Sequence, residues 1–292
     1  MIQYPRGEVK PVSDDIYAVL AAAGDKVRQA GAQNERIKYL LRLASGGAQL
    51  PDGLVALDGL WAHIRAAEAG LETQVCVICP ELVHSEEARA LARSYISRTP
   101  EVYSVSARLF ERLGGRESPD GFFSLAELPR PELSSVRRDG GGFVVVLDGL
   151  ESPGNIGTIL RTADGAGADA VFVCGRRARL NSPKVVKSSM GALFIVPVFE
   201  FADAEKCRDW LRCNGFAIYL ADERADRLYS EHEYAGNTAL VVGGERYSLS
   251  EGWYGQDART LAIPMHGKLS SLNAGVAASV IMYEICRRKR SM

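Results

Sequence analysis

Three segments in the second half of the chain constrain its fold most. Each consists of an apolar strand pattern that breaks into a glycine-rich or polar loop: LDGLESPGNIGTILRTADGAGAD from Leu147, VVGGERYSLS from Val241 and IPMHGKLSSLNAGVAASVIMYE from Ile263. The first and third loops run directly into helical patterns. Since α/β proteins build ligand sites from loops at the carboxyl edge of a parallel sheet, the three segments predict an α/β fold with one shared site.

Length and composition set the broad class. The 292 residues allow about two domains of roughly 100 to 200 residues each. With 47% hydrophobic and 24% charged residues, the composition is typical of a globular enzyme. No apolar run approaches the ~18 residues that cross a bilayer, and the amino terminus has acids and prolines where a secretory signal is apolar. We therefore expect a cytoplasmic protein with no membrane partner.

The six cysteines are too sparse for a disulfide scaffold, so we expect reduced thiols. Cys76 and Cys79 form a CxxC motif inside the apolar stretch TQVCVICPEL, without a second CxxC or a nearby histidine pair. An apolar strand is the favoured interpretation, and no metal site is expected.

The net charge of −1 gives no overall electrostatic case for nucleic-acid binding. Two local basic clusters could bind a phosphate backbone. One combines Arg176, Arg177 and Arg179 with Lys184 and Lys187; the other is the RRKR run at 287–290. The alternative is that the first is a solvated loop and that the second is a set of basic side chains favoured at the carboxyl end of a helix.

The pattern along the chain divides it into an extension and two domains. Residues 1–32 form an extension with one helix that starts after Ser13-Asp14-Asp15 and ends at Gly31. Residues 33–130 alternate strand and helix patterns, which indicates a small βαβ-type domain. The stretch 131–142 is rich in Pro, Ser, Arg and Gly and is expected to be a linker.

Residues 143–292 form the second domain, in which six β-branched apolar runs predict a parallel sheet buried on both faces. Its last helix, LNAGVAASVIMYEICRR, carries Ala, Gly and Ser on the side away from Leu272, Val276 and Tyr283. Because small residues let another backbone come close, this side is predicted to pack against a neighbour, and a second subunit would fit there.

The three loops bring together one cation, one acid and three neutral hydrogen-bonding groups: Arg161, Glu245, Asn155, Ser271 and Asn273. Such a set suits a polar, anionic substrate, because the arginine fork matches phosphate. The alternative is that Asn155, Ser271 and Asn273 are turn and helix caps. No P-loop, GxGxxG, HExxH or GxSxG motif occurs, and the four histidines are isolated.

These residues carry a resemblance to a known family. The NxGxxxR of 155–161, the GGE of 243–245 and the IPM…SSLN of 263–273 resemble the three motifs of the SpoU (TrmH) family of S-adenosylmethionine-dependent RNA ribose 2′-O-methyltransferases, in the SPOUT superfamily. The match extends over the second domain. The first domain resembles, more weakly, the L30e-like substrate-binding module of this family.

The resemblance implies a trefoil-knotted α/β methyltransferase domain, a homodimer, and rRNA or tRNA as the partner. Backbone groups at Gly243, Ile263, Met265 and Leu272 would hold S-adenosyl-L-methionine. Arg161 would be catalytic, with Asn155, Glu245, Ser271 and Asn273 completing the site. The cluster of Arg176, Arg177, Arg179, Lys184 and Lys187 would bind the RNA.

Two departures keep other interpretations open. Relatives commonly follow the motif glutamate with a glycine-containing turn, whereas this chain has Arg246 and Tyr247 after Glu245. Relatives also often have a basic segment after the first helix of the substrate-binding domain, whereas this chain has ASGGAQLPDG there. The alternatives are an inactive or diverged paralogue that binds RNA or cofactor, a ribosomal methylase that confers antibiotic resistance, and a methyltransferase for a nucleoside-containing small molecule.

Overall fold

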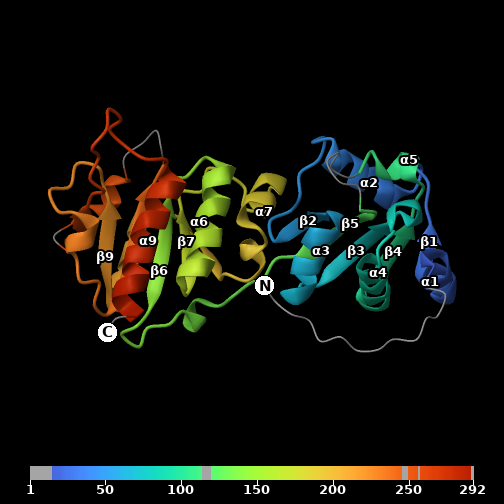
Figure 1. Ribbon diagram of the computed structural model, residues 1–292, viewed down its shortest axis with the longest axis horizontal. Helices are drawn as coiled ribbons and strands as arrows, with labels where there is room; N and C mark the ends of the chain where they lie inside the picture. Colours follow the sequence, from blue (N-terminus) through green and yellow to red (C-terminus); the bar gives the residue numbers. More distant parts are fainter. Residues whose placement is uncertain (1–14, 114–119, 245–248, 256, 291–292) are drawn as a thin grey trace. The chain divides into compact units, whose positions relative to one another are not determined.

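The computed structural model describes residues 15–113, 120–244, 249–255 and 257–290. The chain forms two compact units, Met1–Glu127 and Leu128–Met292 (Figure 1). Within the described residues, no helix combines the length and apolar character that a membrane crossing requires.

The first unit is built on a mixed five-stranded sheet with the order β1-β4-β3-β5-β2. The strands are β1 (Val27–Gln29), β2 (Leu54–Asp58), β3 (Thr73–Ile78), β4 (Glu101–Ser104) and β5 (Phe122–Glu127). Strands β1, β4 and β3 run parallel, whereas β5 is antiparallel to both β3 and β2. The predicted βαβ pattern is therefore confirmed for the parallel part of this sheet, and the antiparallel strands β5 and β2 complete it.

Helices cover both faces of this sheet because side chains of β3 alternate between them. Val75 and Val77 pack with α2 (Glu35–Ala44), and Cys76 and Ile78 pack with α4 (Glu86–Arg98). The remaining helices are α1 (Ile16–Ala22), α3 (Gly59–Glu68) and the single turn α5 (Ala107–Phe110). The CxxC motif is thus part of a buried strand, as expected.

The segment predicted as a separate extension belongs to this unit. Ile16 is buried in the α4 core, and β1 pairs with β4 as an edge strand. The helix predicted to reach Gly31 is wrong, because it ends at Ala22 and Gly24 then adopts a left-handed φ of 54°. A three-residue edge strand with one apolar residue leaves no periodic pattern to detect.

The second unit contains a six-stranded, fully parallel sheet with the order β11-β9-β10-β6-β7-β8. The strands are β6 (Phe143–Asp148), β7 (Ala170–Cys174), β8 (Val198–Phe201), β9 (Phe216–Ala221), β10 (Asn237–Gly243) and β11 (Arg259–Leu261). Both predictions, the parallel sheet and its burial on two faces, are confirmed.

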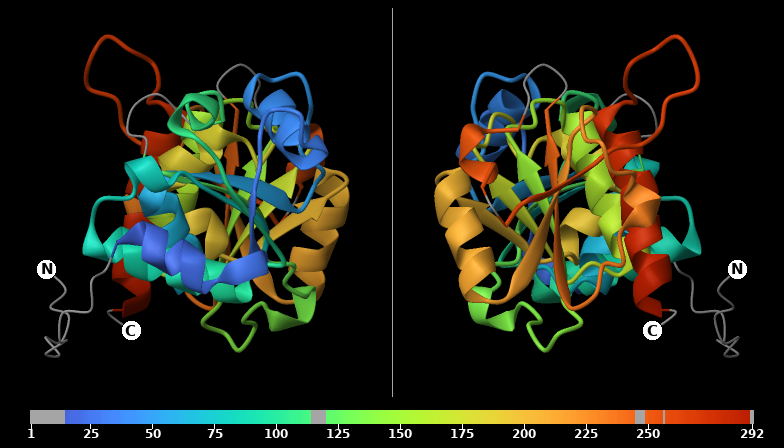
Figure 2. Two further views of the ribbon diagram at one scale, coloured as in Figure 1. Left: turned by 90° about the vertical axis from the view of Figure 1, so that its right-hand side faces the viewer. Right: turned by 90° about the vertical axis from the view of Figure 1, so that its left-hand side faces the viewer.

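Helices α6 (Pro153–Ala166) and α9 (Ala274–Arg290) lie on one face of this sheet and pack against each other, while α8 (Ala204–Cys213) covers the other face (Figure 2). Helix α7 (Pro183–Ser189) packs against α6. The segment predicted as a linker joins this unit, since Val136 is buried in the core beneath α8. One apolar residue in a polar stretch gives too little pattern to predict that burial.

The small-residue side of α9 is used within the chain. A Cβ added at Gly275 would lie 3.3 Å from Thr158 Cγ2 of α6, and Ala274 and Ala278 are buried. The expected close neighbour is therefore α6 and not a second subunit. Val276 and Tyr283, on the other side of α9, are about half exposed at 48% and 55%.

Candidate functional site

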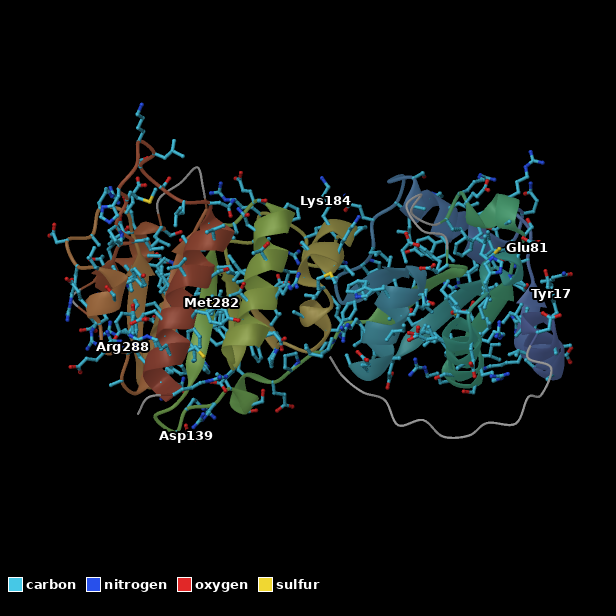
Figure 3. The ribbon with its side chains drawn as sticks, viewed as in Figure 1. Tyr17, Glu81, Asp139, Lys184, Met282 and Arg288 are labelled. Carbon is cyan, nitrogen blue, oxygen red and sulfur yellow. The ribbon has the colours of Figure 1, made fainter. Side chains whose placement is uncertain are left out.

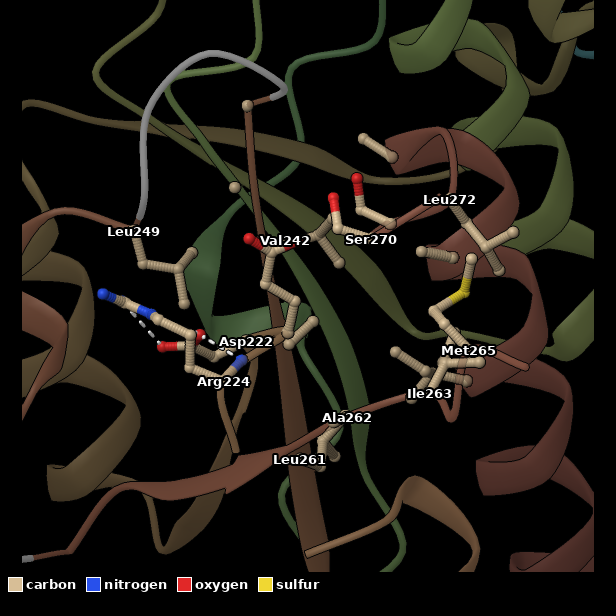
Figure 4. A pocket seen from close by; sticks show the side chains of 18 of the residues that line it. Asp222, Arg224, Val242, Leu249, Leu261, Ala262, Ile263, Met265, Ser270 and Leu272 are labelled. Atoms are coloured by element: carbon tan, nitrogen blue, oxygen red, sulfur yellow. Dashed lines mark hydrogen bonds and ion pairs between the residues drawn. The ribbon is translucent and has the colours of Figure 1, made fainter. Parts of the chain in front are cut away.

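A cavity of about 330 Å³ opens at the carboxyl edge of the second sheet (Figure 4). Its walls come from the last residues of β9, β10 and β11, from the segments that follow them, and from the first half of α9. The lining residues are Ala221, Asp222, Glu223, Arg224, Val242, Gly243, Gly244, Leu249, Tyr254, Leu261, Ala262, Ile263, Met265, Ser270, Ser271, Leu272, Ala274, Ala277 and Ile281.

All four residues that the sequence assigns to a cofactor contribute to this lining: Gly243, Ile263, Met265 and Leu272. Ser271 lies there as well. Asn155, Arg161 and Asn273 do not line the cavity, and Glu245, with Arg246 and Tyr247, falls outside the described residues. The structure thus places the predicted cofactor residues in one cavity and puts three of the predicted catalytic residues around helices α6 and α9.

Asn155 and Asn273 join the starts of these two helices. The Asn273 side-chain amide donates to Asn155 Oδ1 at 3.0 Å, and its own Oδ1 accepts from the backbone N–H of Gly275 at 3.0 Å and of Val276 at 3.3 Å. Asn273 therefore caps α9, as the cap interpretation predicted, and also ties the cavity segment 263–273 to the motif on α6.

Arg161 is exposed on α6 and makes no hydrogen bond or ion pair with any described residue. The next residue, Thr162, contacts Ser279 of α9 through hydroxyl oxygens 2.9 Å apart. An arginine with a free planar fork beside a helix pair is suited to bind a phosphate from outside the chain.

The motif glycine Gly157 is required by packing. A Cβ at this position would lie 1.9 Å from Ser188 Oγ and 2.7 Å from the Ser189 backbone nitrogen, so α7 can approach α6 only because residue 157 has no side chain. At Gly243, an added Cβ would come within 3.1 Å of Leu249 Cδ2, a cavity side chain. Gly157 therefore sets the packing of α6 against α7, and Gly243 sets the position of a side chain in the cavity.

Asp148 is a buried residue of the site that the sequence interpretation missed. It ends β6, and its carboxylate accepts from the Ser250 backbone N–H at 2.7 Å and from the Ser250 hydroxyl at 3.0 Å. These bonds anchor the segment that carries Leu249 to the carboxyl edge of the sheet. An aspartate directly after an apolar strand was the available signal.

A second missed cluster consists of Asp222, Arg224 and Tyr254. Asp222 Oδ1 accepts from Arg224 Nε at 3.1 Å, Oδ2 accepts from Arg224 Nη2 at 3.2 Å, and the Tyr254 hydroxyl donates to Oδ2 at 2.7 Å. The Arg224 side chain holds the pKa of Asp222 down at about 2. The carboxylate is therefore ionised near neutral pH, and it fixes both neighbours at one end of the cavity.

Comparison with known proteins identifies the family. Residues 142–283 match the model of the SpoU rRNA Methylase family. The 23S rRNA (uridine(2479)-2′-O)-methyltransferase of Streptomyces viridochromogenes is 36% identical over 214 residues, which are 71% of this chain and 73% of that relative. The chain belongs to the SpoU family.

Solved structures of SpoU proteins are similar over both units. The SpoU methyltransferase AviRb from Streptomyces viridochromogenes, in complex with the cofactor AdoMet, has a TM-score of 0.77 and 30% identity, covering 89% of this chain and 98% of its own. An RNA 2′-O ribose methyltransferase has a TM-score of 0.72 and 30% identity, covering 91% and 100%. The α/β fold is therefore that of SpoU methyltransferases.

The cationic cluster of this SpoU protein is partly neutralised by acids. Arg176 pairs with Glu200 at 3.0 Å and Arg177 with Glu151 at 2.9 Å. Lys184 projects from α7 and is exposed (Figure 3). At the end of α9, Arg287 and Arg288 both donate to the Glu284 carboxylate. Two of the four basic residues of the terminal run are therefore paired within their own helix.

His63 has a structural role in the first unit. Its Nδ1–H donates to the Gly59 carbonyl at 2.7 Å, so Nε2 accepts from the Ser124 hydroxyl at 2.8 Å. Burial lowers the pKa of His63 to about 4 and raises the pKa of the Cys76 and Cys79 thiols to about 12. Among the described residues, no group of three or more His, Cys, Asp or Glu could hold a metal ion.

Proposed function

We propose that this SpoU protein transfers the methyl group of S-adenosyl-L-methionine to a ribose 2′-hydroxyl of RNA, either rRNA or tRNA. The observation that carries the proposal is the cavity in which Gly243, Ile263, Met265 and Leu272 meet. A relative with 36% identity is named for 2′-O-methylation of 23S rRNA, and a structure with 30% identity contains AdoMet.

The cavity suits the cofactor chemically. Ile263, Met265 and Ile281 provide apolar walls for an adenine ring, and the irregular backbone of 263–272 offers N–H and C=O groups outside any helix or strand. A concave, mainly apolar site with a few oriented polar groups is the usual form of a cofactor site. When bound, S-adenosyl-L-methionine supplies an electrophilic methyl group on a positively charged sulfur.

The protein residues position the acceptor and stabilise charge. With the cofactor bound, the ribose O2′ would form a bond to the methyl carbon as the carbon–sulfur bond breaks, which would leave S-adenosylhomocysteine and pass the hydroxyl proton to solvent water. An arginine side chain carries a positive charge and a planar fork of hydrogen-bond donors, so Arg161 binds the substrate phosphate and stabilises the developing alkoxide. Asn155 and Asn273 hold α6 and α9 in register, while Glu245 and Ser271 orient the substrate and cofactor.

The second unit carries the trefoil knot of the SPOUT superfamily in this proposal. Support comes from two segments that leave the same sheet edge in different directions. Trp253 packs into the core beneath α8, whereas residues 262–273 lead from the outer strand β11 back to α9, which contacts α6 on the opposite face. True knots are rare in proteins, so family membership is the main support.

A homodimer completes the site. Arg161 does not line the cavity of its own chain, which is consistent with its acting at the cavity of a second copy. Val276 and Tyr283 leave an exposed apolar stripe on α9 that a second subunit would bury. Sedimentation should give a dimer, and a monomeric active enzyme would contradict this arrangement.

The first unit is proposed to be an L30e-like module that binds RNA together with the cluster at Arg176, Arg177, Arg179, Lys184 and Lys187. Its helices on both faces of a small sheet support this assignment. Because phosphate contacts release counterions, RNA binding should weaken as the salt concentration rises. The cytoplasmic location remains a prediction from the sequence.

The decisive test combines labelled S-adenosyl-L-methionine with separated rRNA, tRNA and nucleotides, followed by mapping of the modified residue. The variant Arg161→Ala should lose about a thousandfold or more in transfer rate while its cofactor affinity is unchanged. Arg212→Ala is the matched control, because Arg212 is an arginine on the opposite face of the same sheet, paired with Asp257.

Each outcome has a defined meaning. Label in nucleotides but not in RNA would replace the acceptor by a small molecule. Cofactor binding without transfer to any acceptor would indicate a binding paralogue, and undiminished transfer by Arg161→Ala would remove the proposed mechanism.

A further inference from the structure

The cavity has two chemically different ends. In Figure 4, Asp222 and Arg224 lie on one side with Leu249, and Ile263, Met265 and Leu272 lie on the other. Among the described residues that line the cavity, Arg224 is the only cation, and Asp222 and Glu223 are the only acids. A ligand that fills this space should therefore be apolar at one end and charged at the other.

Arg224 is held so that part of its fork stays available. Asp222 accepts from Nε and Nη2, which form one edge of the guanidinium. The edge formed by the two terminal nitrogens points away from Asp222, and the side chain is 67% exposed. Because an arginine edge binds a carboxylate through two parallel hydrogen bonds, this second edge is suited to an anionic oxygen pair.

Three further hydrogen bonds fix the position of Asp222, and through it that of Arg224. The Asp222 carboxylate also accepts from the Arg224 backbone N–H at 3.0 Å and from the Tyr254 hydroxyl. The Asp222 backbone N–H bonds the Leu261 carbonyl at 3.0 Å, which fixes this turn to the end of β11. Arg224 is therefore oriented before any ligand binds, which limits the entropy lost on binding.

We infer that Arg224, oriented by Asp222 and Tyr254, binds the carboxylate of the aminoacyl tail of the cofactor. The inference rests on the proposed function, which makes S-adenosyl-L-methionine the ligand of this cavity. The tail carries a carboxylate and an ammonium group. The carboxylate meets the free edge of Arg224, the ammonium group faces Asp222 and Glu223, and the adenine occupies the apolar end.

The test compares two neutral thioethers that differ only in the tail. S-adenosylhomocysteine has the aminoacyl group, whereas 5′-methylthioadenosine lacks it. Calorimetric titration of the full-length protein should show that Arg224→Gln weakens S-adenosylhomocysteine about tenfold and changes the affinity for 5′-methylthioadenosine by less than about twofold. Arg224→Lys, which keeps the charge but not the fork, should recover part of the loss.

Arg227→Gln is the matched control. Arg227 follows β9 in the same loop, donates to the Glu231 carbonyl at 2.7 Å and does not line the cavity, so both affinities should stay unchanged. Equal weakening of both ligands by Arg224→Gln, or no weakening of either, would overturn the inference alone. A wild-type protein that binds neither thioether would overturn the proposed function together with it.

Discussion

The two units use their buried polar side chains differently. In the first unit, His63 bonds Gly59 and Ser124, and its backbone carbonyl accepts from the Tyr95 hydroxyl, so the network closes within one core. In the second unit, Asp148 and Asn155 lie where a strand ends and a helix begins. Each bonds a loop about one hundred residues further along the chain, at Ser250 and Asn273.

This difference separates stability from function. A polar network enclosed in a core satisfies its own hydrogen bonds and affects only the folding equilibrium. A polar side chain at the carboxyl edge of a parallel sheet also sets the position of loops that form the cavity. Changes in the first network should therefore alter stability alone, whereas changes in the second should alter stability and methyl transfer together.

The largest effect on stability is expected from the protonation of His63. Its folded pKa of about 4 lies below the ordinary value of 6.5, so the unfolded chain binds the proton more readily. The stabilisation is complete above pH 6.5 and falls progressively toward pH 4, by about 3 kcal/mol for the first unit. Peptide-resolved hydrogen exchange, corrected for the intrinsic effect of pH, measures the opening free energy of β3 and β5.

The variant His63→Gln serves as the control for this prediction. It removes the titrating group, so the opening free energy of β3 should no longer fall by this amount between pH 6.5 and 4. Methyl transfer by the folded fraction should match the wild type at pH 7. A specific loss of transfer in this variant would contradict the claim that the polar network of the first unit affects stability alone.

A smaller effect is expected for Asp148→Ala. The Ser250 N–H and hydroxyl lose a charged acceptor, which costs about 2 kcal/mol in unfolding free energy. Transfer should also fall, by about tenfold, because Leu249 is no longer anchored at the cavity wall. Denaturant unfolding and a transfer assay on the same sample measure both quantities.

Asp169→Ala tests whether position decides the outcome. Asp169 accepts from the Phe143 backbone N–H at 2.7 Å, a comparable bond at the amino edge of the same sheet. Its loss should cost a similar free energy and leave the transfer rate of the folded protein unchanged. If both variants reduced transfer equally, the special role of the carboxyl edge would be refuted.

The smallest effect is expected for a pair of asparagine caps. Asn273→Ala and Asn34→Ala each remove a side chain that accepts from two backbone N–H groups at a helix start, which costs about 1 kcal/mol. Only Asn273→Ala should also reduce transfer, because Asn34 caps α2 in the first unit. Transfer rates and thermal unfolding are measured for both variants. Equal stability losses with a loss of transfer only in Asn273→Ala would show that the two units differ in function.

Much of the fold could be predicted from the sequence. The strands of the second sheet are continuous β-branched runs such as FVVVLD and AVFVC, and burial on both faces makes their pattern strong. Strand β1 and the burial of Val136 could not be predicted, because an edge strand of three residues and a single apolar residue in a loop have no periodicity. Their places depend on the surfaces against which they pack.

The site was predictable where motifs mark it. Gly243, Ile263, Met265 and Leu272 were assigned through the resemblance of their segments to the SpoU motifs, and they line one cavity. The cluster of Asp222, Arg224 and Tyr254 was missed because Asp222 and Tyr254 are 32 residues apart and meet only in the folded chain, where β9 and β11 are neighbours. The signal in the sequence was a polar residue at the end of a parallel strand, as with Asp148 and Asp222.

Strand β1 has a consequence for any shortened form of the protein. Its pairing with β4 covers the edge of the first sheet, and Ile16 fills the adjacent core. A version that begins at residue 33, where sequence pattern alone places the domain start, would leave the backbone N–H and C=O groups of β4 that pair with β1 without partners. Such an open edge is a template for self-association, so the truncated protein should aggregate even if its second unit folds normally.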